Sequence, residues 1–196
     1  MKFIIATNNQ KKLKELERIL NPLGISAVSA MEAGISLDDV EESGTTFAEN
    51  ACIKAEAAFK KTGMPSVADD SGLCVDALDG RPGVFSARYC GENTTDEEKN
   101  TKLLSEMEGI PNEKRTARFT CAICCILPDG RKIEVEGNCE GSIALRPSGN
   151  GGFGYDPIFM YGDKSYAELS DAEKDSISHR GQALRKLKAE LEKIQK

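Results

Sequence analysis

Short apolar runs alternate along this chain of 196 residues with stretches in which apolar residues repeat at helical spacing. The run at 3–6 has the length of a buried strand, and the apolar residues at 13, 16, 19 and 20 then mark one face of a helix. Because strands and helices follow one another without a strict strand–helix–strand order, the pattern predicts an α/β fold with a mixed sheet. Further strands are expected at 25–30, 66–68, 73–78, 119–127 and 132–140.

Capping residues mark where several predicted helices begin and end. Asn8 or Asn9 precedes the first helix, and Thr46 and Glu49 have the spacing of a capping box before the second, which should end at Gly63. Further helices are predicted at 95–107, 167–176 and 179–195, a hairpin turn at 128–130, and loops at 31–45 and 147–154.

Composition places the chain among globular proteins. It is 39% hydrophobic and 30% charged, which suits one α/β domain over residues 1–196. The formal net charge of −6 argues against a nucleic-acid polymer as partner. No apolar run approaches the roughly 20 residues that a membrane span needs, so no membrane is expected and a cytoplasmic location is predicted.

Seven cysteines lie mostly in apolar surroundings, which indicates buried free thiols in a reducing compartment. Cys121 and Cys124 have the spacing of a zinc or redox pair, but they lie within a predicted strand and no second pair accompanies them. Thiols packed in the core are therefore the favoured interpretation.

Lysines occupy the start of the first predicted helix, where the helix dipole is already partly positive. Lys11, Lys12 and Lys14 lie beside unpaired helix amides, an arrangement suited to an anion such as phosphate. A solvated cluster of surface lysines is the alternative. The same feature recurs at 178–180, where His179, the sole histidine, and Arg180 begin a helix; a Ser178–His179 nucleophile pair has little support.

Adjacent carboxylates at Asp69 and Asp70 follow a short predicted strand. With Glu41 and Glu42 they could hold a hard cation such as Mg²⁺, or one could act as a general base toward water. The competing interpretation is an ordinary acidic turn over residues 69–72, since Asp, Ser and Gly all favour turns.

A glycine-rich segment at 149–154 matches G-x-G-x-x-G, but it does not open a helix, so a dinucleotide site is rejected. Phe153 or Tyr155 could stack on a base. Alternatively, both rings join the core of a tight loop. The chain also lacks the G-x-x-x-x-G-K-[ST] sequence of a P-loop.

Taken together, six segments in order resemble the inosine triphosphate pyrophosphatase family, whose members hydrolyse non-canonical purine nucleoside triphosphates to the monophosphate and pyrophosphate. The resemblance covers nearly the whole chain, although many bacterial members have glycine where Lys11 stands. The segments are Thr7-Asn8-Asn9-Gln10-Lys11-Lys12, Glu42-x-Gly44-x-Thr46-Phe47-x-Glu49-Asn50-Ala51, Ala68-Asp69-Asp70-Ser71-Gly72-Leu73, Gly83-x-x-Ser86-Ala87-Arg88-Tyr89, Gly151-Gly152-Phe153-Gly154-Tyr155-Asp156-Pro157 and Ser178-His179-Arg180.

The resemblance implies an elongated mixed sheet with helices on both sides, two lobes with a central substrate cleft, a homodimer and Mg²⁺ dependence. It implies that Asp70 is the general base and a metal ligand and that Glu42, or its neighbour Glu41, is the second metal carboxylate. The implied substrate-binding residues are Thr7, Asn8, Asn9, Gln10, Lys11, Lys12 and Lys54 for the phosphates, Ser71, and Phe153, Gly154, Tyr155, Asp156, Lys174, His179 and Arg180 for the base.

Two other functions stay open on the sequence. One is a pyrophosphatase of the septum-formation-inhibitor type, which has a similar fold but acts on other modified nucleotides. The other is a nucleotide-binding regulator without turnover, against which the acidic residues Asp70 and Glu42 argue.

Overall fold

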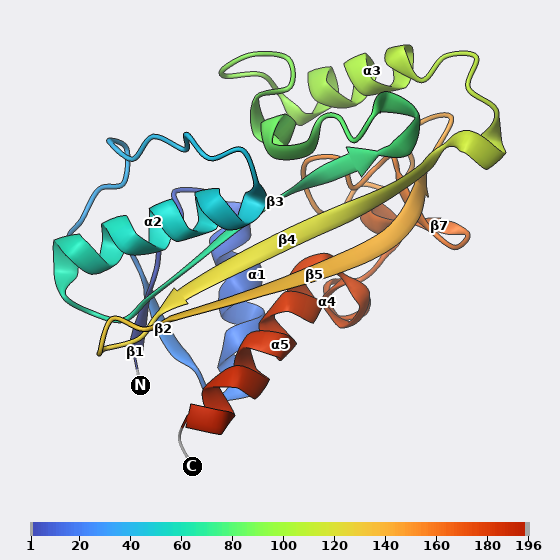
Figure 1. Ribbon diagram of the computed structural model, residues 1–196. Helices are drawn as coiled ribbons and strands as arrows, with labels where there is room; N and C mark the ends of the chain where they lie inside the picture. Colours follow the sequence, from blue (N-terminus) through green and yellow to red (C-terminus); the bar gives the residue numbers. More distant parts are fainter. Residues whose placement is uncertain (1, 195–196) are drawn as a thin grey trace. The chain divides into compact units, whose positions relative to one another are not determined.

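The computed structural model describes residues 2–194 (Figure 1). Its described part holds seven strands in one sheet, five α-helices and several short 3-10 turns. The strands are β1 (Lys2–Ile5), β2 (Ser26–Ser29), β3 (Ser66–Val75), β4 (Thr116–Ile126), β5 (Lys132–Ile143), β6 (Phe159–Tyr161) and β7 (Lys164–Ser165). The helices are α1 (Gln10–Leu20), α2 (Phe47–Thr62), α3 (Asp96–Glu106), α4 (Asp171–Ile177) and α5 (His179–Ile194).

The sheet has the strand order β2-β1-β3-β4-β5-β6-β7. β1 runs parallel to β2 and β3, whereas β6 runs antiparallel to β5 and β7, so the predicted mixed α/β sheet is confirmed. The chain divides into two compact units, and β3, β4 and β5 contribute residues to both. Unit 1 comprises residues 1–70, 121–137 and 179–196, and unit 2 comprises residues 71–120 and 138–178.

Unit 1 has helices on both faces of its strands. Alternate residues of β1 point to opposite sides, because successive side chains of a strand alternate. Phe3 and Ile5 pack with the apolar stripes of α1 and α5, which lie side by side in Figure 1, whereas Ile4 packs with the alanines of α2. Each helix therefore buries its apolar face against one side of the same strands.

Unit 2 has its own core of residues from α3, the remaining parts of β3, β4 and β5, and the segment 155–166. Three aromatic rings lie at its centre. Phe119 lies with its ring centroid 4.6 Å from that of Phe159 and 5.6 Å from that of Tyr166. Such tilted and stacked ring pairs add to the stabilisation from burial.

The predicted helix boundaries are largely confirmed, because the caps act as the sequence indicates. Asn9 is the N-cap of α1, and Thr46 forms the capping box of α2 with Glu49. Gly63, with φ of 65°, ends α2 in the left-handed conformation that glycine adopts without steric cost. The last helix ends at Ile194, and position 195, where it was expected to end, lies outside the described residues.

Two local predictions were wrong. Residues 69–72 do not form a turn: β3 runs without interruption from Ser66 to Val75, with both aspartates in its middle. The helix expected at 167–176 begins only at Asp171, because Ser170 forms a capping box with Glu173 there, and residues 166–168 form a separate 3-10 turn.

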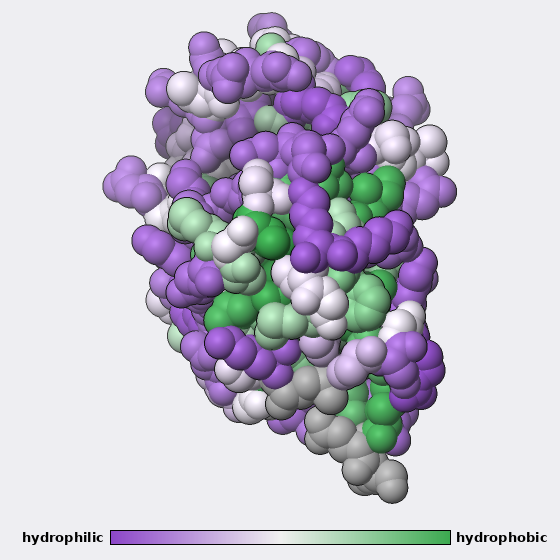
Figure 2. All heavy atoms as spheres, turned by 90° about the vertical axis from the view of Figure 1, so that its left-hand side faces the viewer, coloured by the Kyte–Doolittle hydropathy of each residue, from purple (hydrophilic) through white to green (hydrophobic). Residues whose placement is uncertain are grey.

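The face of the molecule in Figure 2 is hydrophilic over most of its area, with a smaller group of hydrophobic side chains in its middle. Among residues 2–194, no helix is both long and apolar enough to cross a membrane.

Candidate active site

The start of α1 is held by polar side chains of the segment before it. Asn9 caps the helix: its Oδ1 accepts hydrogen bonds from the backbone N–H groups of Lys11 at 3.0 Å and Lys12 at 3.1 Å. Thr7 Oγ1 accepts from the N–H of Asn9, and the Asn8 amide donates to Asp38. This first turn contains no acidic residue, so no carboxylate within it offsets the partial positive charge of the helix end.

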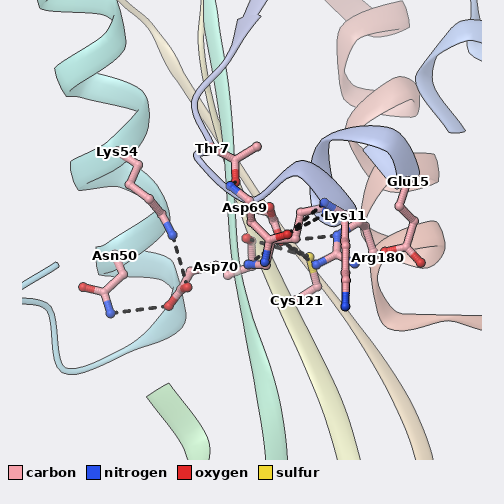
Figure 3. A network of polar contacts seen from close by, with 12 residues as sticks. Thr7, Lys11, Glu15, Asn50, Lys54, Asp69, Asp70, Cys121 and Arg180 are labelled. Atoms are coloured by element: carbon pink, nitrogen blue, oxygen red, sulfur yellow. Dashed lines mark hydrogen bonds and ion pairs between the residues drawn. The ribbon is translucent and has the colours of Figure 1, made fainter. Parts of the chain in front are cut away.

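Lys12 is neutralised by Asp69, which lies on β3. Figure 3 shows the surroundings of Asp69, with Arg180 and Cys121 close to it. The Lys12 Nζ lies 3.2 Å from Asp69 Oδ2. Arg180, at the start of α5, donates to the same oxygen from Nη2 at 2.8 Å and also pairs with Glu15 of α1. The side chains of Asp69, Arg180 and Glu15 are almost completely buried. Four charged groups from three elements thus form one buried network.

The surroundings of Asp69 keep its carboxylate ionised. Burial alone would raise its pKa, but the positive charges of Lys12, Arg180 and Lys54 outweigh burial and hold the pKa of Asp69 well below its ordinary value. Asp69 is therefore a permanent anion at neutral pH.

Its neighbour Asp70 faces a different set of groups. Asp70 Oδ1 lies 3.2 Å from the Nζ of Lys54, and Asp70 Oδ2 lies 3.4 Å from the amide nitrogen of Asn50. The same Lys54 Nζ lies 3.1 Å from Glu42 Oε2. Asn50 and Lys54 are four residues apart on α2, and this spacing places both on the face of the helix that meets β3.

The loop before α2 fixes the orientation of Asn50. Asn50 Oδ1 accepts from the N–H of Gly44 at 2.8 Å, so its amide nitrogen is turned toward Asp70. A Cβ at Gly44 would lie 2.6 Å from that same oxygen, so only glycine fits there. The capping box of Thr46 holds the helix start that carries this contact.

Asp70 and Asp69 are shifted in opposite directions. Burial raises the pKa of Asp70 above its ordinary value, although the charges of Lys54 and Lys12 oppose the rise. The pKa of Lys54 is raised: burial would lower it, but Asp70, Asp69 and Glu42 outweigh burial. When the pKa values of two neighbouring carboxyl groups diverge, the one with the lowered pKa stays an anion and the one with the raised pKa can accept a proton. Asp70 is the group suited to act as a base.

The oxygen donors near Lys54 suit a hard divalent cation. Mg²⁺ is typically held by one or two carboxylates together with substrate phosphates, and Glu42 and Asp70 both direct a carboxylate oxygen to one point, now taken by the Lys54 ammonium. In the described part of the chain, no group of three or more His, Cys, Asp or Glu side chains is placed to hold a metal. The two carboxylates therefore fit a site that the substrate completes.

In unit 2, the glycine-rich segment forms a tight loop around the Asp156 carboxylate. Asp156 Oδ2 accepts from the N–H of Phe153 at 2.8 Å and from Lys174 Nζ at 2.7 Å. The Lys174 ammonium also lies 4.8 Å from the centroid of the Phe153 ring. A Cβ at Gly152 would lie 2.0 Å from the same carboxylate oxygen, which explains the glycine.

Of the two aromatic side chains considered for base stacking, Tyr155 is buried in the core of unit 2, and its hydroxyl donates to the carbonyl of Ser86 at 3.0 Å. Phe153 is only partly buried. Of the two rings, only Phe153 therefore has an exposed part that is available for stacking on a base.

The predicted site residues fall into two groups. Unit 1 contains those expected to bind phosphate and metal, and also His179 and Arg180; both are buried at the start of α5. Unit 2 contains Ser71 and the predicted base-binding residues 153–156 and Lys174. The structure brings together Lys12, Lys54 and Asp70 around β3.

Sequence reasoning assigned no role to two residues that hold this arrangement, Glu15 and Asn50, and it missed the ion pairs of Asp69 with Lys12 and Arg180. One signal was available for Glu15, which interrupts the apolar stripe of α1 between Leu13 and Leu16. A carboxylate at a buried helix position indicates a buried cation as its partner.

The cysteines are all free thiols, and four of them are buried. Cys121 and Cys124 lie on opposite faces of β4: Cys121 packs with α1 and α5, and Cys124 packs with α2. Because they face away from each other, these two thiols cannot bind the same zinc ion. Cys121 lies 3.9 Å from Asp69 Oδ2, within the buried charged network.

Comparison with known proteins identifies the family of the chain. A sequence model of the Ham1 family matches residues 3–190. The chain is 50% identical over 187 residues to a dITP/XTP pyrophosphatase of Halalkalibacterium halodurans, covering 94% of this chain and 96% of that protein. It is 51% identical over 191 residues to a dITP/XTP pyrophosphatase of Bacillus subtilis, covering 96% of each.

A solved structure shows the same fold. The HAM1 protein of Coxiella burnetii superimposes with a TM-score of 0.88 at 43% identity, over 98% of this chain and 99% of that one. The family resemblance inferred from the six sequence segments is thereby confirmed. On its sequence and its fold alike, the chain belongs to the Ham1 family.

Proposed function

We propose that this protein hydrolyses non-canonical purine nucleoside triphosphates (ITP, dITP and XTP) to the nucleoside monophosphate and pyrophosphate. The observation that carries the proposal is the pair of neighbouring carboxylates on β3, one held as an anion between Lys12 and Arg180 and the other placed to accept a proton beside Lys54. Relatives about 50% identical to the chain are named dITP/XTP pyrophosphatases, which supports this substrate class.

In the proposed reaction, the start of α1 binds the triphosphate. The side chains of residues 7–12 supply hydrogen bonds and positive charge, and the helix dipole adds partial positive charge at this end. Lys12 and Lys54 neutralise the negative charge that redistributes over the phosphate oxygens in the transition state. Their present partners, Asp69 and Asp70, hold both ammonium groups in place before the substrate arrives.

Asp70 orients a water molecule and accepts its proton as the water attacks phosphorus. A carboxylate with a raised pKa is the better base, because it binds the proton more readily. Glu42 and Asp70 would hold Mg²⁺, which supplies charge neutralisation to the leaving pyrophosphate. The Mg²⁺ dependence is part of the proposal and rests on the donor set and the family resemblance.

Base recognition is assigned to residues 153–156 and Lys174 of unit 2. The base contacts expected for His179 and Arg180 of unit 1 stay a prediction, and Arg180 is paired with Asp69 and Glu15 in this structure. The 6-keto group of hypoxanthine or xanthine accepts hydrogen bonds, whereas the 6-amino group of adenine donates them. Donors directed at this position would be left unpaired by adenine. We further propose that one pyrophosphatase domain spans residues 1–196, that two copies form a homodimer, and that the enzyme acts in the cytoplasm.

Pyrophosphate release over a panel of nucleotides, with and without Mg²⁺, tests the proposal. Each buried donor left unpaired costs about 1–3 kcal/mol, so two losses give discrimination of roughly 10²-fold or more. ITP and XTP should therefore exceed ATP by at least ~10² in kcat/KM. Equal turnover of ATP and ITP would contradict the base pocket, and preferred turnover of modified pyrimidine nucleotides would support the septum-formation-inhibitor type instead.

Asp70→Asn tests the proposed base. It keeps the shape and the contact with Asn50 but removes the proton acceptor, so kcat should fall by roughly 10²–10⁴-fold while the protein still folds. Asp163→Asn, at an exposed turn position, is the control for loss of one negative charge and should leave kcat unchanged. Activity of Asp70→Asn within about threefold of wild type would remove Asp70 from this role.

A further inference from the structure

Helix α3 holds one residue of the glycine-rich loop by both of its backbone polar groups. Asp96 Oδ2 accepts from the N–H of Gly154 at 2.8 Å, and the amide nitrogen of Asn100 donates to the Gly154 carbonyl at 3.1 Å. All three residues lie in unit 2. Two side chains of one helix therefore fix both peptide planes that meet at Gly154.

The two side chains are themselves well held. Asp96 and Asn100 are four residues apart and so share one face of α3. The capping box of Thr95 and Glu98 fixes the start of the helix. The other oxygen of Asp96 lies 2.9 Å from the Nζ of Lys99, and Asn100 is 5% exposed. The contact with Gly154 is thus made by one buried side chain, Asn100, and by one that an ion pair with Lys99 restrains, Asp96.

Gly154 needs such restraint more than its neighbours do. Its φ of +63° lies in the left-handed region, and no other atom lies near the place where a Cβ would stand. Glycine also has the greatest conformational freedom to lose on folding. On either side, Phe153 is bound through its N–H to Asp156, and Tyr155 is bound through its hydroxyl to Ser86. Gly154 is the link between these two fixed points.

We propose that Asp96 and Asn100 are positioning residues for purine recognition, a role that rests on the proposed function of the 153–156 loop. Neither belongs to the residues assigned above to phosphate binding or catalysis. They hold the Gly154 backbone, and with it the Phe153 ring and the loop's own polar groups, in the arrangement that accepts a 6-keto purine. The groups of a binding site must be held within about 0.5 Å of the productive geometry, and side chains fixed by packing and hydrogen bonds provide this precision.

Steady-state kinetics of wild type and four variants with ITP and ATP tests the role. Asp96→Ala and Asn100→Ala each remove one contact with Gly154. Each should raise KM for ITP about tenfold with kcat within about threefold of wild type, because the groups around Asp70 are untouched. The ratio of kcat/KM for ITP to that for ATP should then fall by about tenfold.

Two controls separate positioning from general destabilisation. Glu97→Ala removes a carboxylate from the same helical turn, where Glu97 is exposed, and should keep the wild-type ratio. Asp96→Asn retains an oxygen that can accept from Gly154, so it should restore most of the discrimination lost in Asp96→Ala. Thermal melting of each variant reports any loss of stability, and Asn100→Ala tests the role independently if Asp96→Ala folds poorly.

The outcomes distinguish a failure of the positioning role from a failure of the proposed function. A wild-type ratio in both alanine variants would overturn the positioning role and leave the pyrophosphatase proposal standing. An equal loss of ratio in Glu97→Ala would also overturn it, because the effect would then come from the helix as a whole. A wild type that does not prefer ITP to ATP would remove the base-recognition proposal and this inference with it.

Discussion

Replacing Asp69 by asparagine should destabilise the protein strongly, although Asp69 is not the proposed base. The change keeps the size of the side chain and an oxygen for Arg180, but it removes the anion shared by Lys12 and Arg180. The Asp69 side chain is 0% exposed and that of Arg180 is 2% exposed, so water cannot replace the lost charge.

The magnitude follows from the burial of the network. Breaking a buried ion pair by removing one partner costs about 3–5 kcal/mol. Glu15 continues to neutralise Arg180, and Lys12 is partly exposed, with 16% of its side chain accessible. The free energy of unfolding should therefore fall by about 3 kcal/mol. For a chain of this length each kcal/mol lowers Tm by roughly 2–4 °C, so Tm should fall by roughly 6–12 °C.

Chemical and thermal denaturation of a double-mutant cycle with Lys12→Met provides the assay. Once the Lys12 cation is also gone, Asp69→Asn should cost less, and the coupling between the two sites should be about 1–2 kcal/mol. Asp163→Asn, which removes an exposed carboxylate, should change stability by no more than about 0.5 kcal/mol. Additive effects in the cycle, or a loss below about 1 kcal/mol for Asp69→Asn, would refute the buried network as a stabilising unit.

The pH dependence gives an independent check with a defined sign. The pKa of Asp69 is lowered in the folded protein, so its stabilising contribution is fully present above the unfolded pKa of ~3.9 and is lost as the pH falls from there toward the folded pKa. The stability difference between wild type and Asp69→Asn should be constant between about pH 5 and 7 and should shrink below about pH 4. A difference that grows on acidification would contradict the assigned direction.

Three further predictions concern the phosphate site, the base loop and the thiols. Lys12→Ala should raise KM for ITP by roughly 10–100-fold, which corresponds to the loss of a charged hydrogen bond. Lys14→Ala, at an exposed position of the same helix, should leave KM unchanged, and equal KM values for the two variants would contradict the phosphate role of Lys12. Gly152→Ala should lower kcat/KM for ITP at least ~10-fold, because its Cβ would meet the Asp156 carboxylate, and wild-type kinetics would show that the loop adapts. Elemental analysis of the purified protein should find less than stoichiometric zinc, since the cysteines are predicted to be structural, and one zinc per chain would overturn this.

Much of the fold follows from local signals in the sequence. Asn9 and Thr46 mark their helices because a cap acts within three residues of itself, and Gly63 ends α2 for an equally local reason. The family resemblance likewise comes from short segments whose order can be seen in the sequence. These features need no knowledge of which residues meet in space.

The wrong prediction at residues 69–72 has a non-local cause, whereas the start of α4 at Asp171 is set by a local capping box. Asp69 and Asp70 look like a turn because two adjacent carboxylates are costly inside a strand unless cations neutralise them. Their cations lie far away in the sequence, Arg180 being 111 residues from Asp69. The lysines of α1 look electrostatically misplaced in the sequence because Asp69, which neutralises Lys12, is distant along the chain. On the sequence alone, Lys12→Ala would be expected to stabilise the unliganded helix; with Asp69 as its partner, the same change should destabilise the protein.

Lys54 gives the resting enzyme its own internal counter-ion. Its ammonium stands where the carboxylates of Glu42 and Asp70 meet, so the unliganded protein has no need of a dissolved ion to hold these acids together. Under the proposed Mg²⁺ dependence, chelators should therefore abolish activity without unfolding the protein. In the proposed reaction, the arrangement favours one order of binding. The phosphates would attract Lys54 away from Glu42 and Asp70, and the two carboxylates would then be available as metal ligands. Nucleotide and Mg²⁺ should accordingly bind synergistically, each strengthening the affinity for the other, and the departure of pyrophosphate should return Lys54 to its resting place.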